Sequence, residues 1–161
     1  MCMKTPEESF RIRPVESSHI GDLIRIGEET NLSPWSAQSY LDEMKNPDAV
    51  LLRLESPDNR TVGFVVGRII LGGLIEAQTD AEIYNIAVIE PLQHRGLGQK
   101  LLGAFLDRCR SRSVVHVWLE VRESNAVAIR FYERTGFEIV QTRNNFYTDP
   151  SEHALLLRLV L

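Results

Sequence analysis

The sequence lacks the features that would place a protein in a membrane, outside the cell or on nucleic acid. No apolar run reaches the roughly 18 residues that a membrane-spanning helix needs. Residues 1–13 lack the basic flank and the apolar stretch of a secretory signal. Lys and Arg number 18 against 22 Asp and Glu, so the net charge of −4 gives no overall attraction to nucleic acid. We therefore expect a cytoplasmic protein that contacts neither membrane nor nucleic acid directly and that leans toward basic partners.

Cysteine is scarce as well, because the chain has only Cys2 and Cys109. Cys109 falls on the apolar side of a helical pattern, which is typical of a small core residue. His19, His116 and His153 show no spacing that suits metal ligands. We assign no chemistry to either cysteine and expect no bound metal.

Length and composition indicate one ordinary folded domain. Hydrophobic residues make up 43% and charged residues 25% of the 161 residues, which is close to the average for globular proteins. A chain of this length is expected to form one core. Because no internal repeat, low-complexity segment or long linker divides it, we expect a single domain over residues 1–161.

Hydrophobic periodicity predicts a mixed order of strands and helices. Apolar runs, alternating or β-branched, predict strands at 10–15, 49–54, 61–71, 81–89, 114–121, 137–140 and 154–161. Helical spacing predicts helices at 19–29, 36–44, 97–110 and 125–135. Ser17 and Ser18 can cap the first helix, and Gly136 closes the last. The crossover through 97–110 makes its flanking strands parallel neighbours, so we expect a mixed α/β fold around one central sheet.

A glycine-containing loop, Gln-His-Arg-Gly-Leu-Gly at 93–98, joins the strand at 81–89 to the helix at 97–110. Gly96 and Gly98 let the backbone approach a ligand closely, and the first-turn amides and the helix dipole favour an anion there. Arg95 adds a positive charge. The loop has neither the Lys-Ser/Thr ending of an ATP-binding Walker A loop nor the three spaced glycines of a dinucleotide site. Taken alone, it is also compatible with a simple tight turn at a helix entry.

The same loop matches the Gln/Arg-x-x-Gly-x-Gly/Ala signature of the GNAT superfamily of acetyltransferases. The segments 83–88, 118–122, 124–129 and 131–137 further resemble the RimI-type protein N-terminal acetyltransferases, as do 34–36 and 143–147. The resemblance is close over 81–137. It implies the GNAT acyl-CoA N-acyltransferase fold, with a mixed sheet of about seven strands and about four helices. It also implies acetyl-CoA as the co-substrate.

The resemblance places the acetyl donor along the end of one strand and on the loop that follows. The backbone of Ile86, Ala87 and Val88 would bind the acetyl-pantetheine arm as an added strand would. The Val88 N–H would stabilise the oxyanion of the reaction. The diphosphate would be held by Gln93, His94, Arg95, Gly96, Leu97, Gly98 and Gln99. Asn125 would hydrogen-bond the pantetheine arm, although its position also suits a helix cap.

Two residues are candidates for the chemistry. Glu120 interrupts an otherwise apolar strand, where a buried carboxylate would be costly without a purpose or partner; the alternative is an exposed strand residue. The resemblance makes Glu120 the base that takes a proton from the attacking amine. It makes Tyr132 both a ligand of the coenzyme sulfur and the acid that protonates the departing thiolate. Amphipathic packing is the alternative for Tyr132.

The acceptor implied by the resemblance is the N-terminal amine of a protein, and the family's best-known case is alanine at the start of a small-subunit ribosomal protein. Trp35, Phe146 and Tyr147 would wall its groove, with Arg143 nearby; aromatic core packing is the alternative. An α-amine has a pKa of about 7.7–8.0 and a lysine side chain about 10.4, so an α-amine demands less of a base. Two other functions remain open, an acetyltransferase for a small amine or lysine and a non-catalytic acyl-CoA-binding module. The presence of both Glu120 and Tyr132 favours an enzyme.

Overall fold

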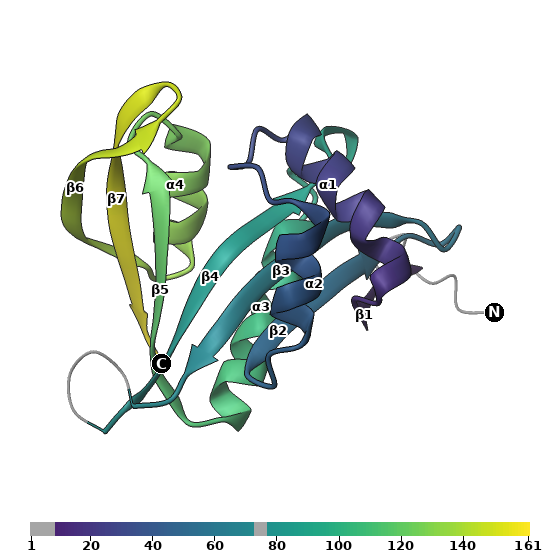
Figure 1. Ribbon diagram of the computed structural model, residues 1–161, viewed down its shortest axis with the longest axis horizontal. Coiled ribbons are helices and arrows are strands. Elements are labelled where there is room, and N and C mark those ends of the chain that lie inside the picture. Colours follow the sequence, from purple (N-terminus) through teal and green to yellow (C-terminus); the bar gives the residue numbers. More distant parts are fainter. Residues whose placement is uncertain (1–8, 73–76) are drawn as a thin grey trace.

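The computed structural model describes residues 9–72 and 77–161, which form one seven-stranded mixed sheet with four α-helices (Figure 1). The strands are β1 (Arg11–Pro14), β2 (Ala49–Glu55), β3 (Thr61–Ile70), β4 (Thr79–Val88), β5 (Val114–Arg122), β6 (Glu138–Thr148) and β7 (Ser151–Val160). The helices are α1 (Ile20–Glu29), α2 (Ala37–Met44), α3 (Leu97–Ser111) and α4 (Ala126–Arg134). The expectation of a mixed sheet of about seven strands and four helices is confirmed.

The strand order is β1-β2-β3-β4-β5-β7-β6. Every neighbouring pair is antiparallel except β4 and β5, which are parallel and are joined through α3. This confirms the crossover that the sequence predicted for the helix at 97–110. Parallel pairing requires such a crossover, because the chain must return to the same end of the sheet.

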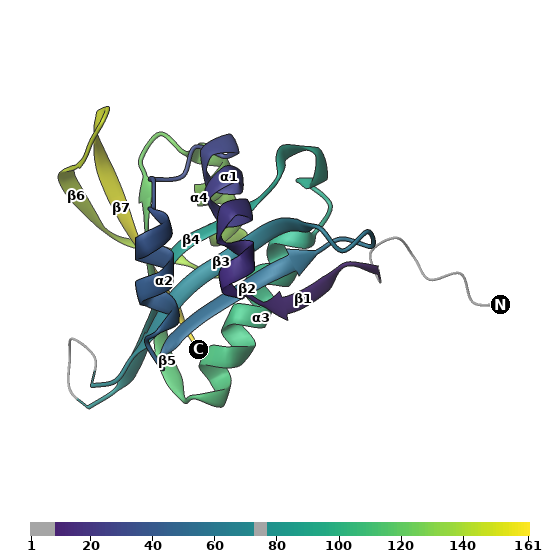
Figure 2. The same ribbon diagram turned by 45° about the vertical axis from the view of Figure 1, so that its right-hand side comes forward.

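The helices cover both faces of the sheet (Figure 2). On one face, Leu23 and Ile26 of α1 and Tyr40 of α2 pack against β3. On the other face, α3 and α4 contribute to a larger core. Its fully or almost fully buried members include Leu54, Val65, Leu101, Leu102, Phe105, Cys109, Val117 and Leu157. Cys109 is therefore a core residue, as its place in the helical pattern predicted.

The sheet opens into a fork between β4 and β5. Their pairing ends at Ile83 opposite Leu119, although β4 stays paired with β3 as far as Val88. Tyr84 is an extra residue in β4 at the same level, since Asn85 pairs with Val66 whereas Ile83 pairs with Gly67. A bulge of this kind bends a strand and increases its twist. One edge of β4 beyond the bulge is therefore left without a neighbouring strand.

Two predicted details are wrong. Ser17 and Ser18 do not cap the first helix, because residues 17–19 form a 3₁₀ turn, and Glu16 and His19 cap that turn reciprocally. The strand predicted at 137–140 continues to Thr148. Its polar stretch at 141–145 has no apolar alternation because β6 is an edge strand with mostly exposed side chains. The last strand begins three residues before its predicted start at 154, and the other predicted elements differ at their ends by at most two residues. Cys2 lies outside the described residues.

Candidate active site

The loop at 93–98 has a backbone conformation that leaves the start of α3 open. Gly96 precedes the helix with φ +76°, a left-handed value that favours glycine, and a Cβ added there would meet no atom within 4 Å. The side-chain amide of Gln93 donates to the Val88 carbonyl at 2.8 Å and so ties the loop to β4. Since Gly96 has no side chain to cap the helix, the first-turn amides can bind an anion.

The other loop residues divide between ligand-facing and structural positions. His94 has φ +61° and an exposed side chain, whereas the Leu97 side chain is buried in the core. The Arg95 guanidinium lies 5.9 Å from the centre of the Phe10 ring. Gly98 lies against the Phe131 ring, which a Cβ would contact at 3.6 Å. Gln99 is exposed in the first turn of α3. The geometry fits a diphosphate that is held mainly by backbone N–H groups.

The unpaired edge of β4 continues from this loop toward the fork. The Ile89 N–H donates to the Val62 carbonyl at 3.0 Å, on the β3 side. Because N–H groups of successive strand residues point to opposite sides, the Val88 and Ile86 N–H groups point away from β3. No described strand pairs with that side of β4 beyond Ile83. An extended ligand arm could hydrogen-bond there as a further strand would.

A cleft of about 260 Å³ lies at the fork. It is lined by Asn31, Leu32, Ser33, Trp35, Glu82, Ile83, Tyr84, Asn85, Ile86, Leu119, Glu120, Val121, Arg122, Asn125, Ala128, Tyr132, Phe146 and Tyr147. The structure thus brings together candidates from the loop before α2, β4, β5, α4 and β6. Ala87, Val88, residues 93–99 and Arg143 do not line it. Ala87 and Val88 lie further along β4, residues 93–99 lie on the loop before α3 and in its first turn, and Arg143 lies on β6.

Glu120 lies on β5, one residue past the last β4–β5 pair. Its carboxylate forms a 2.8 Å ion pair with the guanidinium of Arg143 on β6, and its side chain is 17% exposed. Burial raises the pKa of Glu120 above its usual range, and the nearby Arg143 charge partly opposes that rise. A carboxylate in this state is a better proton acceptor than a fully solvated one.

Tyr132 lies on α4 across the fork from β4. Its ring packs edge-on against Phe131 at 5.3 Å and Phe137 at 5.4 Å between ring centres. Burial raises the pKa of Tyr132 well above its usual value, with a smaller contribution from Tyr147. The hydroxyl is therefore fully protonated near neutral pH, as a proton donor must be. Packing and a chemical role are compatible here, because the residue also lines the cleft.

Asn125 caps α4, since its side chain accepts a hydrogen bond from the Ala128 N–H at 3.2 Å. The structure therefore bears out the capping role that the sequence suggested. Asn125 also lines the cleft, so its amide nitrogen is available to a ligand.

Aromatic side chains from two parts of the chain line the cleft. Trp35, on the loop before α2, lies 5.1 Å from Tyr40 and 5.6 Å from Tyr84 between ring centres. Phe146 and Tyr147 on β6 pack edge to face at 5.1 Å. The three residues predicted to wall a groove therefore do line one. Trp35 and its two partners also pack together, so packing and lining coexist.

Arg122 positions the β6–β7 wall. Its guanidinium lies 4.2 Å from the centre of the Tyr147 ring and forms a 3.2 Å ion pair with Glu152 on β7. Glu152 in turn accepts a hydrogen bond from the Ser124 N–H at 2.6 Å. These contacts connect the end of β5 to the hairpin that carries Phe146 and Tyr147.

Several residues of the cleft were not identified from the sequence. Glu82, Tyr84 and Asn85 on β4 and Arg122 on β5 all line it. Glu82 carried the same signal as Glu120, an acidic residue in an apolar strand. Asn85 is buried, and its side chain lies close enough to the Tyr40 hydroxyl to lower the pKa of that group, against the larger rise that burial causes. The bulge at Tyr84 had no local signal, because it depends on how β4 pairs with β3.

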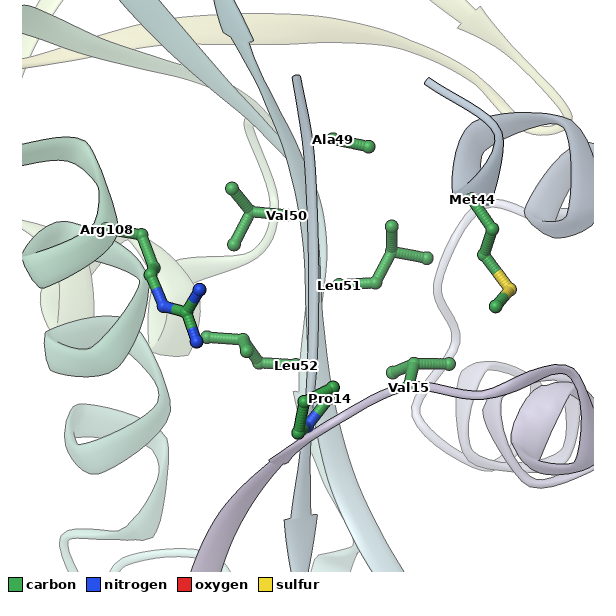
Figure 3. Close-up of a pocket in the computed structure, with 8 residues that line it drawn as sticks. All are labelled: Pro14, Val15, Met44, Ala49, Val50, Leu51, Leu52 and Arg108. Atoms are coloured by element: carbon green, nitrogen blue, oxygen red, sulfur yellow. The ribbon is translucent and has the colours of Figure 1, made fainter. Parts of the chain in front are cut away.

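A second hollow, of about 230 Å³, lies beside β2, and its residues are drawn in Figure 3. It is lined by Pro14, Val15, Met44, Ala49, Val50, Leu51, Leu52 and Arg108. Arg108 on α3 is its only ionisable side chain. Without a carboxylate, histidine or tyrosine it cannot move a proton, so we take the cleft at the fork as the active site.

The described residues contain neither a metal-binding cluster nor a membrane-spanning helix. Within 9–72 and 77–161 there is no group of three or more His, Cys, Asp or Glu side chains that could hold a metal ion. Among those residues there is also no helix long and apolar enough to span a membrane.

Known proteins resemble this chain in sequence and in fold. The acetyltransferase (GNAT) family matches residues 21–137. The [ribosomal protein bS18]-alanine N-acetyltransferase of Salmonella typhimurium is 35% identical over 130 residues, which are 80% of this chain and 81% of that protein. The crystal structure of the ribosomal-protein-S18-alanine N-acetyltransferase from Escherichia coli superposes with a TM-score of 0.80 at 29% identity, covering 94% of this chain and 93% of that one. Ard1 from Thermoplasma volcanium gives a TM-score of 0.84 at 28% identity over 95% and 98% of the two chains.

Proposed function

We propose that this chain, which belongs to the acetyltransferase (GNAT) family and is an acetyl-CoA-dependent N-acetyltransferase, acts on the α-amine at the N-terminus of a protein. The observation that carries the proposal is the pair of Glu120 and Tyr132, which come from β5 and α4 and line one cleft beside the unpaired edge of β4. A proton acceptor and a proton donor are what amine acetylation requires.

The finer proposal is that the acceptor begins with alanine and belongs to a ribosomal protein. Relatives at about a third identity over most of their length are named for that activity on bS18. Ribosomal proteins are generally basic, and the net charge of −4 on this chain suits a basic partner.

The proposed role of each residue follows from its position in the site. Acetyl-CoA, when bound, supplies the acetyl group as a reactive thioester. The amides at the start of α3 would hold its diphosphate, and the open edge of β4 would hold its arm. The Val88 N–H points to that edge and would hold the thioester oxygen where negative charge develops. Glu120 would take the proton from the amine nitrogen, and the Tyr132 hydroxyl would give a proton to the sulfur.

The modest basicity of this site favours an α-amine over a lysine. Glu120 is a carboxylate whose pKa burial raises and Arg143 restrains. An α-amine with a pKa of about 7.7–8.0 is already roughly one-tenth neutral at pH 7, whereas a lysine with a pKa of about 10.4 is almost wholly charged. The walls of Trp35, Phe146 and Tyr147 also suit the end of a peptide, because aromatic faces pack on an extended chain.

Mass spectrometry of acetylated products tests the proposal. The protein is incubated with acetyl-CoA and one acceptor at a time. The acceptors are a peptide that begins with alanine, a peptide that begins with methionine, and spermidine. A peptide with a blocked N-terminus and an internal lysine is the control for side-chain acetylation. We expect acetylation of the alanine peptide at its first residue and none of the blocked peptide. Acetylation of spermidine or of lysine alone, with no acetylation of a peptide N-terminus, would overturn the proposal.

A further inference from the structure

The carboxylate of Glu82 is the one acidic group of the cleft to which the mechanism above assigns no task. Glu82 is half-buried on β4, and its carboxylate forms no hydrogen bond or ion pair with any other described residue. Among the acidic groups around it, Glu120 is paired with Arg143 and Glu43 with Arg68. A partly buried carboxylate without a partner is costly to maintain unless it binds something.

Glu82 and Glu120 lie at the apex of the fork and on the same face of the sheet. Glu82 pairs with Trp118 in the register of β4 and β5, and Glu120 is two residues further along β5. Because side chains two residues apart on a strand share a face, the two carboxylates point to the same side. Burial raises the pKa of Glu82, and the negative charge of Glu120 raises it further. The two groups therefore interact electrostatically across the cleft.

Neighbouring cations do not neutralise this pair. Arg68 is opposite Glu82 across the β3–β4 pairing, but its guanidinium donates two hydrogen bonds to Glu43 on α2. Arg143 forms its ion pair with Glu120. Each of these two cations lowers the pKa of Glu82 by less than burial or Glu120 raises it. The cleft thus has one carboxylate charge in excess on its acceptor side.

An amine acceptor in its charged form would supply the positive charge that balances this extra carboxylate. Before it reacts, an α-amine is mostly an ammonium group with three N–H donors. We propose that Glu82 binds this ammonium group and holds it beside Glu120, which then removes its proton. The proposal rests on the acetylation of an amine in this cleft. It makes Glu82 a binding residue for the charged form of the acceptor, distinct from the base.

Steady-state kinetics of Glu82→Gln test the assignment with the alanine peptide at pH 6.5 and pH 9. At pH 6.5 the amine is charged, and the loss of a hydrogen bond to a charged group should raise the peptide KM about tenfold or more. At pH 9 the amine is mostly neutral, so the rise should fall below about twofold. The KM for acetyl-CoA should stay unchanged at both pH values. Glu82→Asp should recover part of the binding at pH 6.5.

Glu138→Gln is the matched control, because it removes the same charge from an exposed position on β6 that does not line the cleft. Its peptide KM should stay within about twofold of the wild-type value at both pH values. An equal rise in KM at pH 6.5 and pH 9 for Glu82→Gln, or no rise at pH 6.5, would overturn the role of Glu82.

Spermidine separates this inference from the proposed function. If the wild-type protein acetylates spermidine and not the peptide, the peptide acceptor is wrong. Glu82 would still be tested, because the amines of spermidine stay largely charged at both pH values, so Glu82→Gln should raise its KM at both. If the peptide is acetylated equally well by wild type and by Glu82→Gln, the proposed function stands and the role of Glu82 is wrong.

Discussion

The groups proposed to bind acetyl-CoA, called the donor side of the site, are backbone amides at the end of β4 and the start of α3. They come from one continuous stretch, 86–99, and the Gln93 contact to Val88 ties its parts together. The groups proposed to face the amine, called the acceptor side, are side chains from separate segments of the chain. They include Trp35, Glu82, Glu120 and Tyr147. The two sides meet at the fork where β4 and β5 separate.

The difference reflects the two substrates. The donor is a constant molecule, so a short backbone motif that recognises its diphosphate and arm is sufficient. The acceptor differs from enzyme to enzyme, and side chains on loops and strand ends can change without altering the frame of the sheet. Substitutions should therefore affect the kinetics of one substrate or the other according to the side on which they fall.

The largest effect is expected for Glu120→Gln, on the acceptor side. Loss of a general base typically lowers turnover about 10²–10⁴-fold, and kcat/KM for the peptide should fall by that order. The Kd for acetyl-CoA, measured by calorimetry, should change less than about twofold, because Glu120 is not among the backbone groups proposed to hold acetyl-CoA. A large loss of acetyl-CoA binding would mean that the two sides are not separate.

Tyr132→Phe should have the next largest effect, because Tyr132 lines the cleft and is the proposed proton donor. Loss of the proton donor should lower kcat on the order of 10²-fold. The KM for acetyl-CoA should rise much less, since the ring that packs on Phe131 and Phe137 remains. Single-turnover kinetics distinguish the chemical step from product release. An unchanged rate in that measurement would remove Tyr132 as the acid.

Arg143→Gln tests how the acceptor side sets the pH profile. Arg143 opposes the rise that burial causes in the pKa of Glu120, so its removal should raise that pKa further. A base acts only in its unprotonated form, and activity falls as the pH drops through its pKa. The acid limb of the profile of kcat/KM should therefore move to higher pH, while thermal stability changes little. An acid limb that stays in place or moves to lower pH would contradict the coupling of Arg143 to Glu120.

The smallest effects are expected on the donor side, from a pair of alanine substitutions in the loop. Gly96→Ala places a side chain at φ +76°, which should cost about 1–2 kcal/mol of stability and weaken acetyl-CoA binding. Gly98→Ala should change stability by no more than about 0.5 kcal/mol, because its Cβ would only reach van der Waals contact with Phe131. Urea unfolding measures the stability of each variant, and the KM for acetyl-CoA reports its binding of the donor. Equal losses in the two variants would show that backbone conformation is not what the loop requires.

Features that depend on nearby residues could be predicted from the sequence. Asn125 caps α4 by accepting from the Ala128 N–H, as its position at the start of that helix predicted. The glycine loop, the crossover helix and the fold class were also predicted, as was the placing of Trp35, Glu120 and Tyr132 in one site. The sequence could not indicate the length of β6, because a polar edge strand has no apolar period.

By itself the sequence determined the loop between β4 and α3, because its glycines and the helix start lie within one short stretch. Only the tertiary structure decided the electrostatics of the acceptor side. The pairing of Glu120 with Arg143, the engagement of Arg68 by Glu43 and the unpaired carboxylate of Glu82 all depend on strands and helices distant in the chain. A local pattern specifies backbone conformation, whereas the charge that a side chain faces is set by the register of the whole sheet.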